Sequence, residues 1–296
     1  MNLPAVSIVI PTYNQADLLK EAIESVLGQT FTDWEAIVIN NYSEDHTVAV
    51  VQAFADSRLR LVNFRNHGII GASRNEGVRQ TRGELVAFLD SDDTWEANKL
   101  ERAMTSFGQP GIDLVCHDEW LWENEQKKQV LRYGPYTSYK ALLFKRNCLS
   151  PSATMVRRGS FMAVGGFSLE RRFAGVEDYD LWLRLARAGC RFHYLHEPLG
   201  SFRVHGESFS SKIEHHCVNS LNLLEAHFAQ WRPQTPYYRY LMRKRRADAY
   251  RGAARACLKH GSHGEARRYL LKAIKEDPLS WKAWVLTGLN LAGLKI

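Results

Sequence analysis

The segment Phe88-Leu89-Asp90-Ser91-Asp92-Asp93 decides the fold of this chain. It closes an apolar run that begins at Leu85, and an apolar run bounded by polar residues predicts a buried strand. The clustered carboxylates concentrate negative charge where this strand ends, and their repulsion favours a bound cation. A divalent metal that carries a phosphate group is one interpretation. The other is a solvated acidic turn that caps a helix beginning just after Asp93 and Thr94.

Strands and helices alternate along the first third of the chain. Compact apolar runs predict strands at residues 6–10, 35–39, 59–62 and 85–89. Apolar residues at helical spacing predict helices between them, at residues 17–27, from about residue 44 onward, and at residues 72–80. This order indicates βαβ units. We therefore predict an α/β fold with a mostly parallel central sheet flanked by helices on both faces.

Polar and aromatic residues follow the carboxyl ends of three predicted strands, which is where ligands bind in such sheets. In chain order they are Pro11, Thr12 and Tyr13; Asn40 and Asn41; and Asp90, Ser91 and Asp92. An aromatic ring, amides and carboxylates together suit a nucleotide whose phosphates are bridged by a metal. Neither GxGxxG nor GxxxxGK[ST] occurs at these positions, which disfavours a dinucleotide-binding fold or a P-loop.

Length and composition indicate a large domain with an appendage. The chain has 296 residues, of which 45% are hydrophobic, so a sizeable core can form. Its five cysteines are scattered without a CxxC pair, which indicates reduced thiols and neither a disulfide framework nor a zinc cluster. No signal-peptide pattern is recognised, and the uncharged stretch 283–294 is too short to cross a bilayer. We therefore expect a cytoplasmic protein.

Positive charge is concentrated towards the C-terminus. Residues 212–296 hold 16 Lys and Arg against 6 Asp and Glu, whereas residues 1–211 hold 23 against 26. A basic tail on a mildly acidic body favours an anionic partner, and a solvated basic face is the alternative. Because no nucleic-acid-binding module is recognisable, we expect no nucleic acid partner. We favour peripheral docking of the tail to the inner face of an anionic membrane.

The C-terminal region is predicted to be helical, at residues 220–231, 237–260, 263–276 and 279–294. Part of it fits one tetratricopeptide-like repeat. A single repeat cannot bury both of its faces, so it should pack on the rest of the chain or on a protein partner. We expect a catalytic domain at residues 1–211 and a basic helical region at residues 212–296.

Several motifs, in order along the chain, carry a resemblance to a known family. They are Val6–Asn14, Ser25–Thr30, Ser73–Gly77, Arg82–Glu84 and Asp90–Asp93. Together they resemble the family-2 inverting glycosyltransferases of the GT-A fold, and the similarity continues to about residue 210. The resemblance implies a metal-dependent transfer of a sugar from a nucleoside-diphosphate sugar, most often a UDP-sugar, to a hydroxyl acceptor. It further implies a carbohydrate or lipid-linked acceptor in cell-surface polysaccharide or glycolipid synthesis.

The same resemblance implies catalytic and metal-binding residues. Glu177-Asp178 is similar to a family motif whose second acid is the catalytic base, whereas from the residues alone this pair suits the start of a helix. Asp92 corresponds to a ligand of Mn²⁺ or Mg²⁺, and Asp90 to a residue that orients the ribose or the metal's water. His205 corresponds to a further metal or diphosphate ligand, although a lone histidine is as often structural.

The donor site is expected at the motifs that resemble the family's nucleotide-binding segments. Its candidates are Pro11, Thr12, Tyr13, Asn14, Asn40, Asn41, Arg74, Asp90 and Ser91. One departure matters: family members often carry two aspartates where this chain has Asn40-Asn41. An amide has both an acceptor and donors, so the identity of the donor base stays open.

Two alternative functions remain. A sugar-phosphate nucleotidyltransferase also combines a βαβ sheet with acids at the strand ends, but it would normally show a glycine-rich basic loop where Pro11–Asn14 stands. A non-catalytic glycosyltransferase-like adaptor would use the C-terminal helices to recruit partners. The presence of both Asp92 and Asp178 argues against the adaptor.

Overall fold

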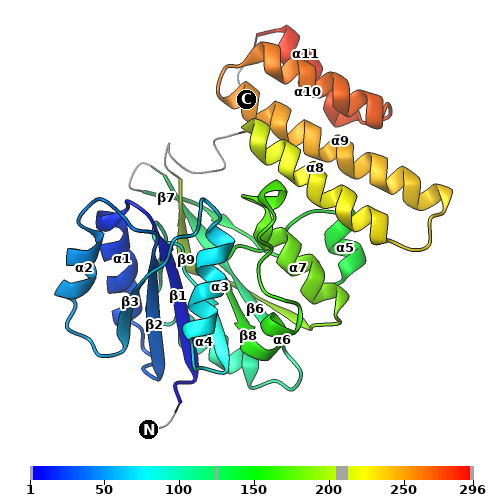
Figure 1. Cartoon of the computed structure of the whole chain (residues 1–296). Helices are drawn as coiled ribbons and strands as arrows, with labels where there is room; N and C mark the ends of the chain where they lie inside the picture. The colour runs from blue at the N-terminus through cyan, green and yellow to red at the C-terminus, as the bar shows by residue number, and fades with distance from the viewer. Residues whose placement is uncertain (1–2, 124–125, 205–212, 294–296) are drawn as a thin grey trace. The chain divides into compact units, whose positions relative to one another are not determined.

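The computed structural model describes residues 3–123, 126–204 and 213–293. The chain forms two compact units, which Figure 1 shows coloured along the sequence. Unit 1 contains residues 1–142, 147–169 and 177–205. Unit 2 contains residues 143–146, 170–176 and 206–296. Each unit is described on its own below.

Unit 1 is built on a nine-stranded mixed sheet with the order β3-β2-β1-β4-β8-β6-β9-β5, and β7 pairs with β6. The strands are β1 (Val6–Thr12), β2 (Trp34–Asn40), β3 (Leu59–Asn63), β4 (Leu85–Phe88), β5 (Thr94–Trp95), β6 (Leu114–Glu123), β7 (Gln126–Leu131), β8 (Thr154–Arg157) and β9 (Phe192–Arg203). The first four strands run parallel, as the sequence predicts. Every residue of β1, β2 and β4 is buried, which is typical of parallel strands covered on both faces.

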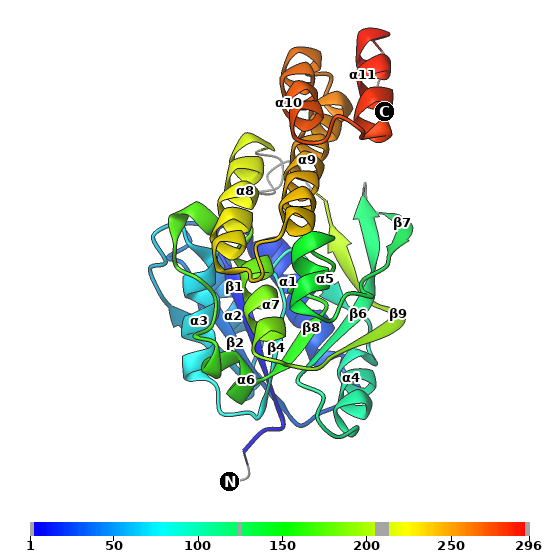
Figure 2. The same ribbon diagram turned by 90° about the vertical axis from the view of Figure 1, so that its right-hand side faces the viewer.

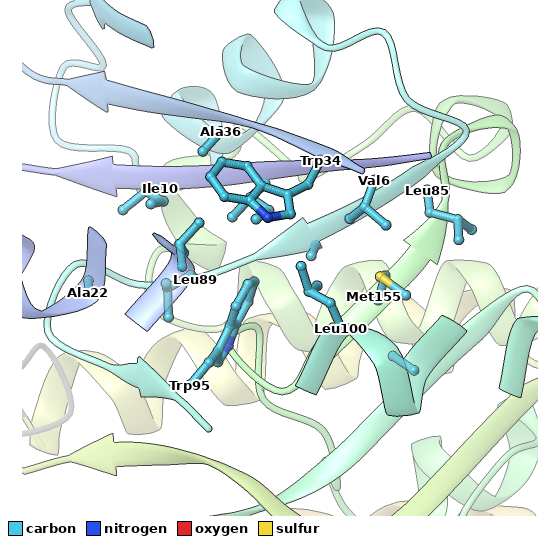
Figure 3. Packing of buried hydrophobic residues seen from close by; sticks show 14 of the residues in the cluster. Val6, Ile10, Ala22, Trp34, Ala36, Leu85, Leu89, Trp95, Leu100 and Met155 are labelled. Carbon is cyan, nitrogen blue, oxygen red and sulfur yellow. The ribbon is translucent and has the colours of Figure 1, made fainter. Parts of the chain in front are cut away.

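The helices of unit 1 connect and cover these strands. They are α1 (Ala16–Leu27), α2 (Thr47–Ala53), α3 (Ile70–Gln80), α4 (Lys99–Phe107), α5 (Tyr139–Phe144, whose last two residues belong to unit 2), α6 (Arg158–Ala163) and α7 (Glu177–Arg187). On one face of the sheet, apolar residues of α1 and α4 join those of β1, β2 and β4 in one core cluster. Figure 3 shows Trp34, Leu89, Trp95 and Leu100 within that cluster.

The other face of the sheet is packed with aromatic side chains. Phe88 of β4 lies with its ring centroid 5.7 Å from that of Phe161 and 5.1 Å from that of Phe167. Helix α3 approaches β1 so closely that a Cβ at Gly77 would lie 2.3 Å from Val9 Cγ1, so only glycine fits there. Trp182 of α7 is fully buried and so belongs to the core.

The acidic segment after β4 does not cap a helix. Thr94–Trp95 forms β5, which pairs antiparallel with Ser201 and Gly200 of β9, and α4 begins only at Lys99. The interpretation of this segment as a helix-capping turn is therefore wrong. The partner strand lies more than a hundred residues later in the chain, so no local pattern could have predicted the pairing.

Unit 2 is helical in its described residues. It contains a short 3₁₀ helix, Arg171–Phe173, and the helices α8 (Ile213–Gln230), α9 (Pro236–Lys259), α10 (His263–Glu276) and α11 (Trp281–Leu291). Small apolar residues of α9 and α10 pack with Leu286 of α11 in a second core. Figure 2 shows α10 and α11 next to each other at the end of the chain. Across the described ranges, no helix is long and apolar enough to span a membrane.

Candidate active site

The strand order places the candidate residues at one edge of the sheet. The chain winds from β1 through β2 to β3 and then crosses back, so that β4 lies on the opposite side of β1. Ligands of open α/β sheets bind at such a switch point, beyond the carboxyl ends of the strands. Tyr13 follows β1, Asn41 follows β2, and Asp90 and Asp92 follow β4. The structure therefore brings these four residues to the edge where a ligand is expected.

Arg74 joins the two acidic motifs. Its guanidinium Nη2 lies 2.6 Å from Asp90 Oδ1, and its Nη1 lies 3.1 Å from Glu177 Oε1. The side chain is buried, with 4% of its surface exposed, and the carboxylates of Asp90 and Glu177 raise its pKa against the effect of burial. Asp178 is near enough to add to this electrostatic effect. One buried cation on α3 therefore brings the end of β4 together with the start of α7.

Asp178 lies in the first turn of α7, next to Glu177. Its Oδ2 accepts a hydrogen bond from Asn147 Nδ2 at 3.2 Å. Burial, and then the charge of Glu177, raise the pKa of Asp178 from its ordinary value of 3.8 to about 6. A carboxylate with a pKa near neutrality can take a proton from a hydroxyl group more effectively than an ordinary aspartate. The electrostatics of Asp178 thus suit a general base.

Buried hydrogen bonds hold the acidic segment in place. Asp90 N donates to Ser152 Oγ at 3.0 Å, and Ser152 Oγ donates to Asp93 Oδ2 at 2.5 Å. Asp93 Oδ1 also accepts from the backbone N–H of Arg203 at 2.9 Å. Burial and the neighbouring Asp92 raise the pKa of Asp93 well above its ordinary range. Asp93 is thus buried and hydrogen-bonded within the protein, whereas Asp92 is only half-buried.

The amides after β2 differ in role. Asn40 is buried and fully engaged: its Nδ2 donates to Asn63 Oδ1 at 2.8 Å, and its Oδ1 accepts from the backbone N–H and the hydroxyl of Ser43. Asn41 is half-buried, and its Oδ1 accepts from Asn66 N at 2.9 Å. Asn40 therefore holds the loop, and Asn41 is the more accessible of the two amides.

The residues after β1 are divided in the same way. Pro11 and Thr12 are buried in the sheet. Tyr13 is 52% exposed, and Asn14, which adopts a φ of 51°, accepts a hydrogen bond from Glu44 N at 2.8 Å. Ser91 is buried, and its hydroxyl donates to Gln15 Oε1 at 2.6 Å. Tyr13 and Asn14 are thus the members of this motif that a ligand can reach.

Several further residues support the candidate acids, and of these Asp93 belongs to the acidic segment that the sequence already marked. Asn147, Ser152 and Asp93 hold the candidate acids, yet each is an ordinary polar residue whose partner is distant in the chain. Glu119 lies buried behind the acidic segment, where burial raises its pKa to about 7. Lys99 Nζ lies 3.5 Å from the Trp95 ring centroid, and burial lowers the pKa of this lysine to about 7. For Glu119, the signal in the sequence is an acidic pair at residues 118–119, which follows the apolar run 114–116 and His117.

His205, the further expected ligand, lies outside the described residues. Within the residues that the structure does describe, no group of three or more His, Cys, Asp and Glu side chains is arranged to hold a metal by itself. Any ion at Asp90 and Asp92 would therefore need further ligands, for which His205, a bound substrate and water are the candidates.

Comparison with known proteins identifies the family. The model of "Glycosyl transferase family 2" matches residues 7–165, which is more than half of the chain. The chain belongs to glycosyl transferase family 2. Among related sequences, the Escherichia coli UDP-Glc:alpha-D-GlcNAc-diphosphoundecaprenol beta-1,3-glucosyltransferase WfgD is 33% identical over 183 residues, covering 62% of this chain and 70% of WfgD. The uncharacterized glycosyltransferase RT0329 of Rickettsia typhi is 28% identical over 242 residues, covering 77% of this chain and 70% of that protein.

Solved structures of other proteins share the fold. S. aureus TarS 1–349 in complex with UDP-GlcNAc superposes with a TM-score of 0.66 at 16% identity, covering 98% of this chain and 92% of TarS. The mannosyltransferase PcManGT from Pyrobaculum calidifontis, in complex with GDP-Man and Mn²⁺, gives a TM-score of 0.63 at 18% identity, covering 99% and 81%. The GT-A fold that the sequence predicts is confirmed. The family also places the chain among the glycosyltransferases, the first of the three functions considered above.

Proposed function

We propose that this glycosyltransferase moves a sugar from a nucleoside-diphosphate sugar to a hydroxyl acceptor in a metal-dependent reaction that inverts the anomeric carbon. One observation carries the proposal: Arg74 bridges Asp90, which follows β4, to Glu177 and also lies within electrostatic reach of Asp178. A direct displacement needs two functions at one place, a site for the departing diphosphate and a base for the attacking hydroxyl.

Asp92 and Asp90 form the diphosphate side of the site. Their carboxylate oxygens are the hard ligands that Mg²⁺ and Mn²⁺ prefer, and the clustered negative charge around buried Asp93 favours a cation. When bound, the ion would act as a Lewis acid that stabilises charge on the departing diphosphate. His205 remains our candidate for an additional ligand. PcManGT, which has the same fold, was crystallised with Mn²⁺.

Asp178 acts as the base in this proposal. Its raised pKa matches the task, since the carboxylate is ionised at neutral pH yet still binds a proton well. Glu177 is held by Arg74 and in turn raises the pKa of Asp178. Because a single carboxylate on the acceptor side activates the hydroxyl for direct attack, the expected product has the inverted configuration.

The donor is expected to lie across β1, with its nucleoside towards Tyr13, Asn14 and Asn41. The sequence favours UDP-sugars, and the solved relatives of this fold include complexes with UDP-GlcNAc and GDP-Man. The name of WfgD describes transfer to a diphosphoundecaprenol-linked sugar. We accordingly propose a carbohydrate or lipid-linked acceptor in the synthesis of a surface polysaccharide.

Unit 2 offers a surface for docking to an anionic membrane. Leu279 is 84% exposed and Trp281 is 68% exposed, and Lys282 Nζ lies 5.7 Å from the Trp281 ring centroid. Exposed tryptophan beside lysine is typical of segments that lie in a membrane interface. The basic run at residues 243–246 should contribute less to membrane binding than its charge suggests, because Arg243 and Arg246 form ion pairs within the unit. We propose that α11 contacts anionic phospholipid.

The membrane proposal is tested by sedimentation with vesicles. The protein should co-sediment with vesicles rich in phosphatidylglycerol at low salt and be released at high salt. A Trp281→Ser variant should bind less, while Lys145→Ser, at an exposed position of unit 2 outside α8–α11, should not differ from the unchanged chain. Equal retention of all three proteins would mean that α11 is not the contact surface.

The reaction is tested by a donor screen. The protein is incubated with Mn²⁺ and a panel of sugar nucleotides, and release of nucleoside diphosphate is measured with and without candidate acceptors. Asp178→Asn should abolish transfer and leave nucleotide binding nearly intact. Near-normal turnover by this variant would show that Asp178 is not the base.

A further inference from the structure

One face of α3 contacts the segment that leads into α7. Gly71, Arg74 and Asn75 share this face, because residues three and four positions apart lie together on a helix. Asn75 Nδ2 donates to Phe167 O at 2.8 Å, and Asn75 Oδ1 accepts from Phe167 N at 2.8 Å. A single carboxamide therefore pairs with both backbone polar groups of Phe167 and holds this segment against α3.

Gly71 lies at the point of closest approach. A Cβ added there would lie 3.0 Å from Phe167 Cβ, 3.2 Å from Ser168 O and 3.3 Å from Glu177 Cγ. Carbon atoms pack favourably only at about 3.5 Å or more, so any side chain would push these atoms away. Alanine is the better helix former, and Gly71 is a buried residue of α3. Glycine at this position is therefore explained by the lack of space.

Glu177 lies between Gly71 and Arg74. Its Cγ is beside Gly71, and its Oε1 lies 3.1 Å from Arg74 Nη1. Because only 6% of the Glu177 side chain is exposed, it has little room to move elsewhere. Asp178 is the next residue, and both belong to the first turn of α7. A displacement of Glu177 would therefore displace Asp178 as well.

We propose that Gly71 is a positioning residue: its lack of a side chain lets the start of α7 lie against α3, which fixes the position of the Asp178 carboxylate. Asn75 supports the same placement through Phe167, while Arg74 supplies the charge. This inference rests on the proposed function, in which Asp178 acts as the base. The nucleotide is expected at the carboxyl ends of β1, β2 and β4. The rate of the chemical step should therefore depend on Gly71, whereas nucleotide binding should not.

Gly71→Ala tests this role by adding one methyl group at the contact. Turnover is measured as release of nucleoside diphosphate from a donor that the unchanged protein uses, at a temperature below the melting point of each variant. Binding of UDP or GDP, whichever that donor contains, is measured by calorimetry with Mn²⁺. We expect kcat to fall about tenfold or more and Kd to change by less than about twofold, because small displacements of a catalytic group are costly.

Gly159→Ala is the matched control. Gly159 is an exposed glycine of α6, and a Cβ there would meet no atom within 4 Å. The same chemical change should therefore leave both kcat and Kd as they are in the unchanged protein.

Asn75→Ser is the second variant, for the case that Gly71→Ala does not fold. It removes the two hydrogen bonds to Phe167 without adding volume, and it should likewise lower kcat more than it weakens nucleotide binding. An unchanged kcat in the folded variants, or a Kd that weakens as much as kcat falls, overturns this inference alone. If the unchanged protein releases no nucleoside diphosphate from any donor, the proposed function fails, and this inference fails with it.

Discussion

Replacing Asp178 with asparagine should remove activity and at the same time stabilise the protein. The pKa of Asp178 is about 6 in the folded chain against an ordinary value of 3.8. Each pKa unit corresponds to about 1.4 kcal/mol, so ionised Asp178 destabilises the folded state by up to about 3 kcal/mol. Asparagine carries no charge and avoids this destabilisation. Loss of the base should lower turnover by roughly 10²- to 10⁴-fold.

The sign of the pH dependence follows from the direction of the shift. The folded state binds the proton of Asp178 more tightly than the unfolded state does. Stability attributable to this group therefore falls as pH rises from about 4 to about 6, and then stays constant. The gain in stability from Asp178→Asn, relative to the unchanged protein, should be largest above pH 7 and should disappear towards pH 4.

Thermal unfolding at several pH values measures this advantage. For a unit of roughly 200 residues, 3 kcal/mol corresponds to a rise in Tm of about 6 to 12 °C, which is an upper limit. Asp180→Asn is the matched control. Asp180 is buried on the same helix, but its Oδ2 lies 2.7 Å from Arg184 Nη2, so loss of its negative charge should lower Tm. If Asp178→Asn melts at or below the unchanged protein at pH 8, burial of an ionised Asp178 is not what raises its pKa.

Four other outcomes are expected. Arg74→Ala should lower both the melting temperature and the activity. The free energy of unfolding should fall by about 3–5 kcal/mol, because the buried acids lose their partner. An unchanged melting temperature would contradict the bridging role. Asp92→Asn should abolish the Mn²⁺-dependent part of nucleotide binding measured by calorimetry, and binding that stays metal-dependent would exclude Asp92 as a ligand. Gly77→Ala should destabilise by about 1–3 kcal/mol in chemical denaturation, since Val9 must move; a neutral effect would mean that α3 can shift. kcat/KM should fall about tenfold per pH unit below the pKa of Asp178, near 6; a flat profile down to pH 5 would argue against it as base.

Much of the fold of unit 1 was predictable because its first four strands are parallel and buried. Their apolar runs are continuous, so the sequence marks them clearly, and the bounds of the observed strands differ from the predicted ones by at most two residues. The same regularity predicts which residues follow the carboxyl ends of strands. Tyr13, Asn41 and Asp92 could therefore be named as site candidates from the sequence alone.

Contacts between distant segments were not predictable in the same way. From the residues alone, Glu177 suits the acidic start of a helix, and only the family resemblance marked it as part of a catalytic motif. Its ion pair with Arg74, 103 residues earlier, which links it to the end of β4, had no signal in the sequence. Ser152 is a similar case, because its hydrogen bonds to Asp90 N and Asp93 depend on the antiparallel pairing of β8 with β4. Such contacts depend on sheet order, which local patterns do not encode.

The charge balance of the site supports the proposed need for a cation. Arg74 is the buried guanidinium that faces Asp90, Glu177 and Asp178, so one positive charge meets three carboxylates. A diphosphate adds further negative charge and would be repelled from the end of β4 unless a cation entered with it. Arg74 cannot serve in that role, because both of its terminal nitrogens are already paired with Asp90 and Glu177. It follows that nucleotide and divalent metal should bind cooperatively, with each weak in the absence of the other.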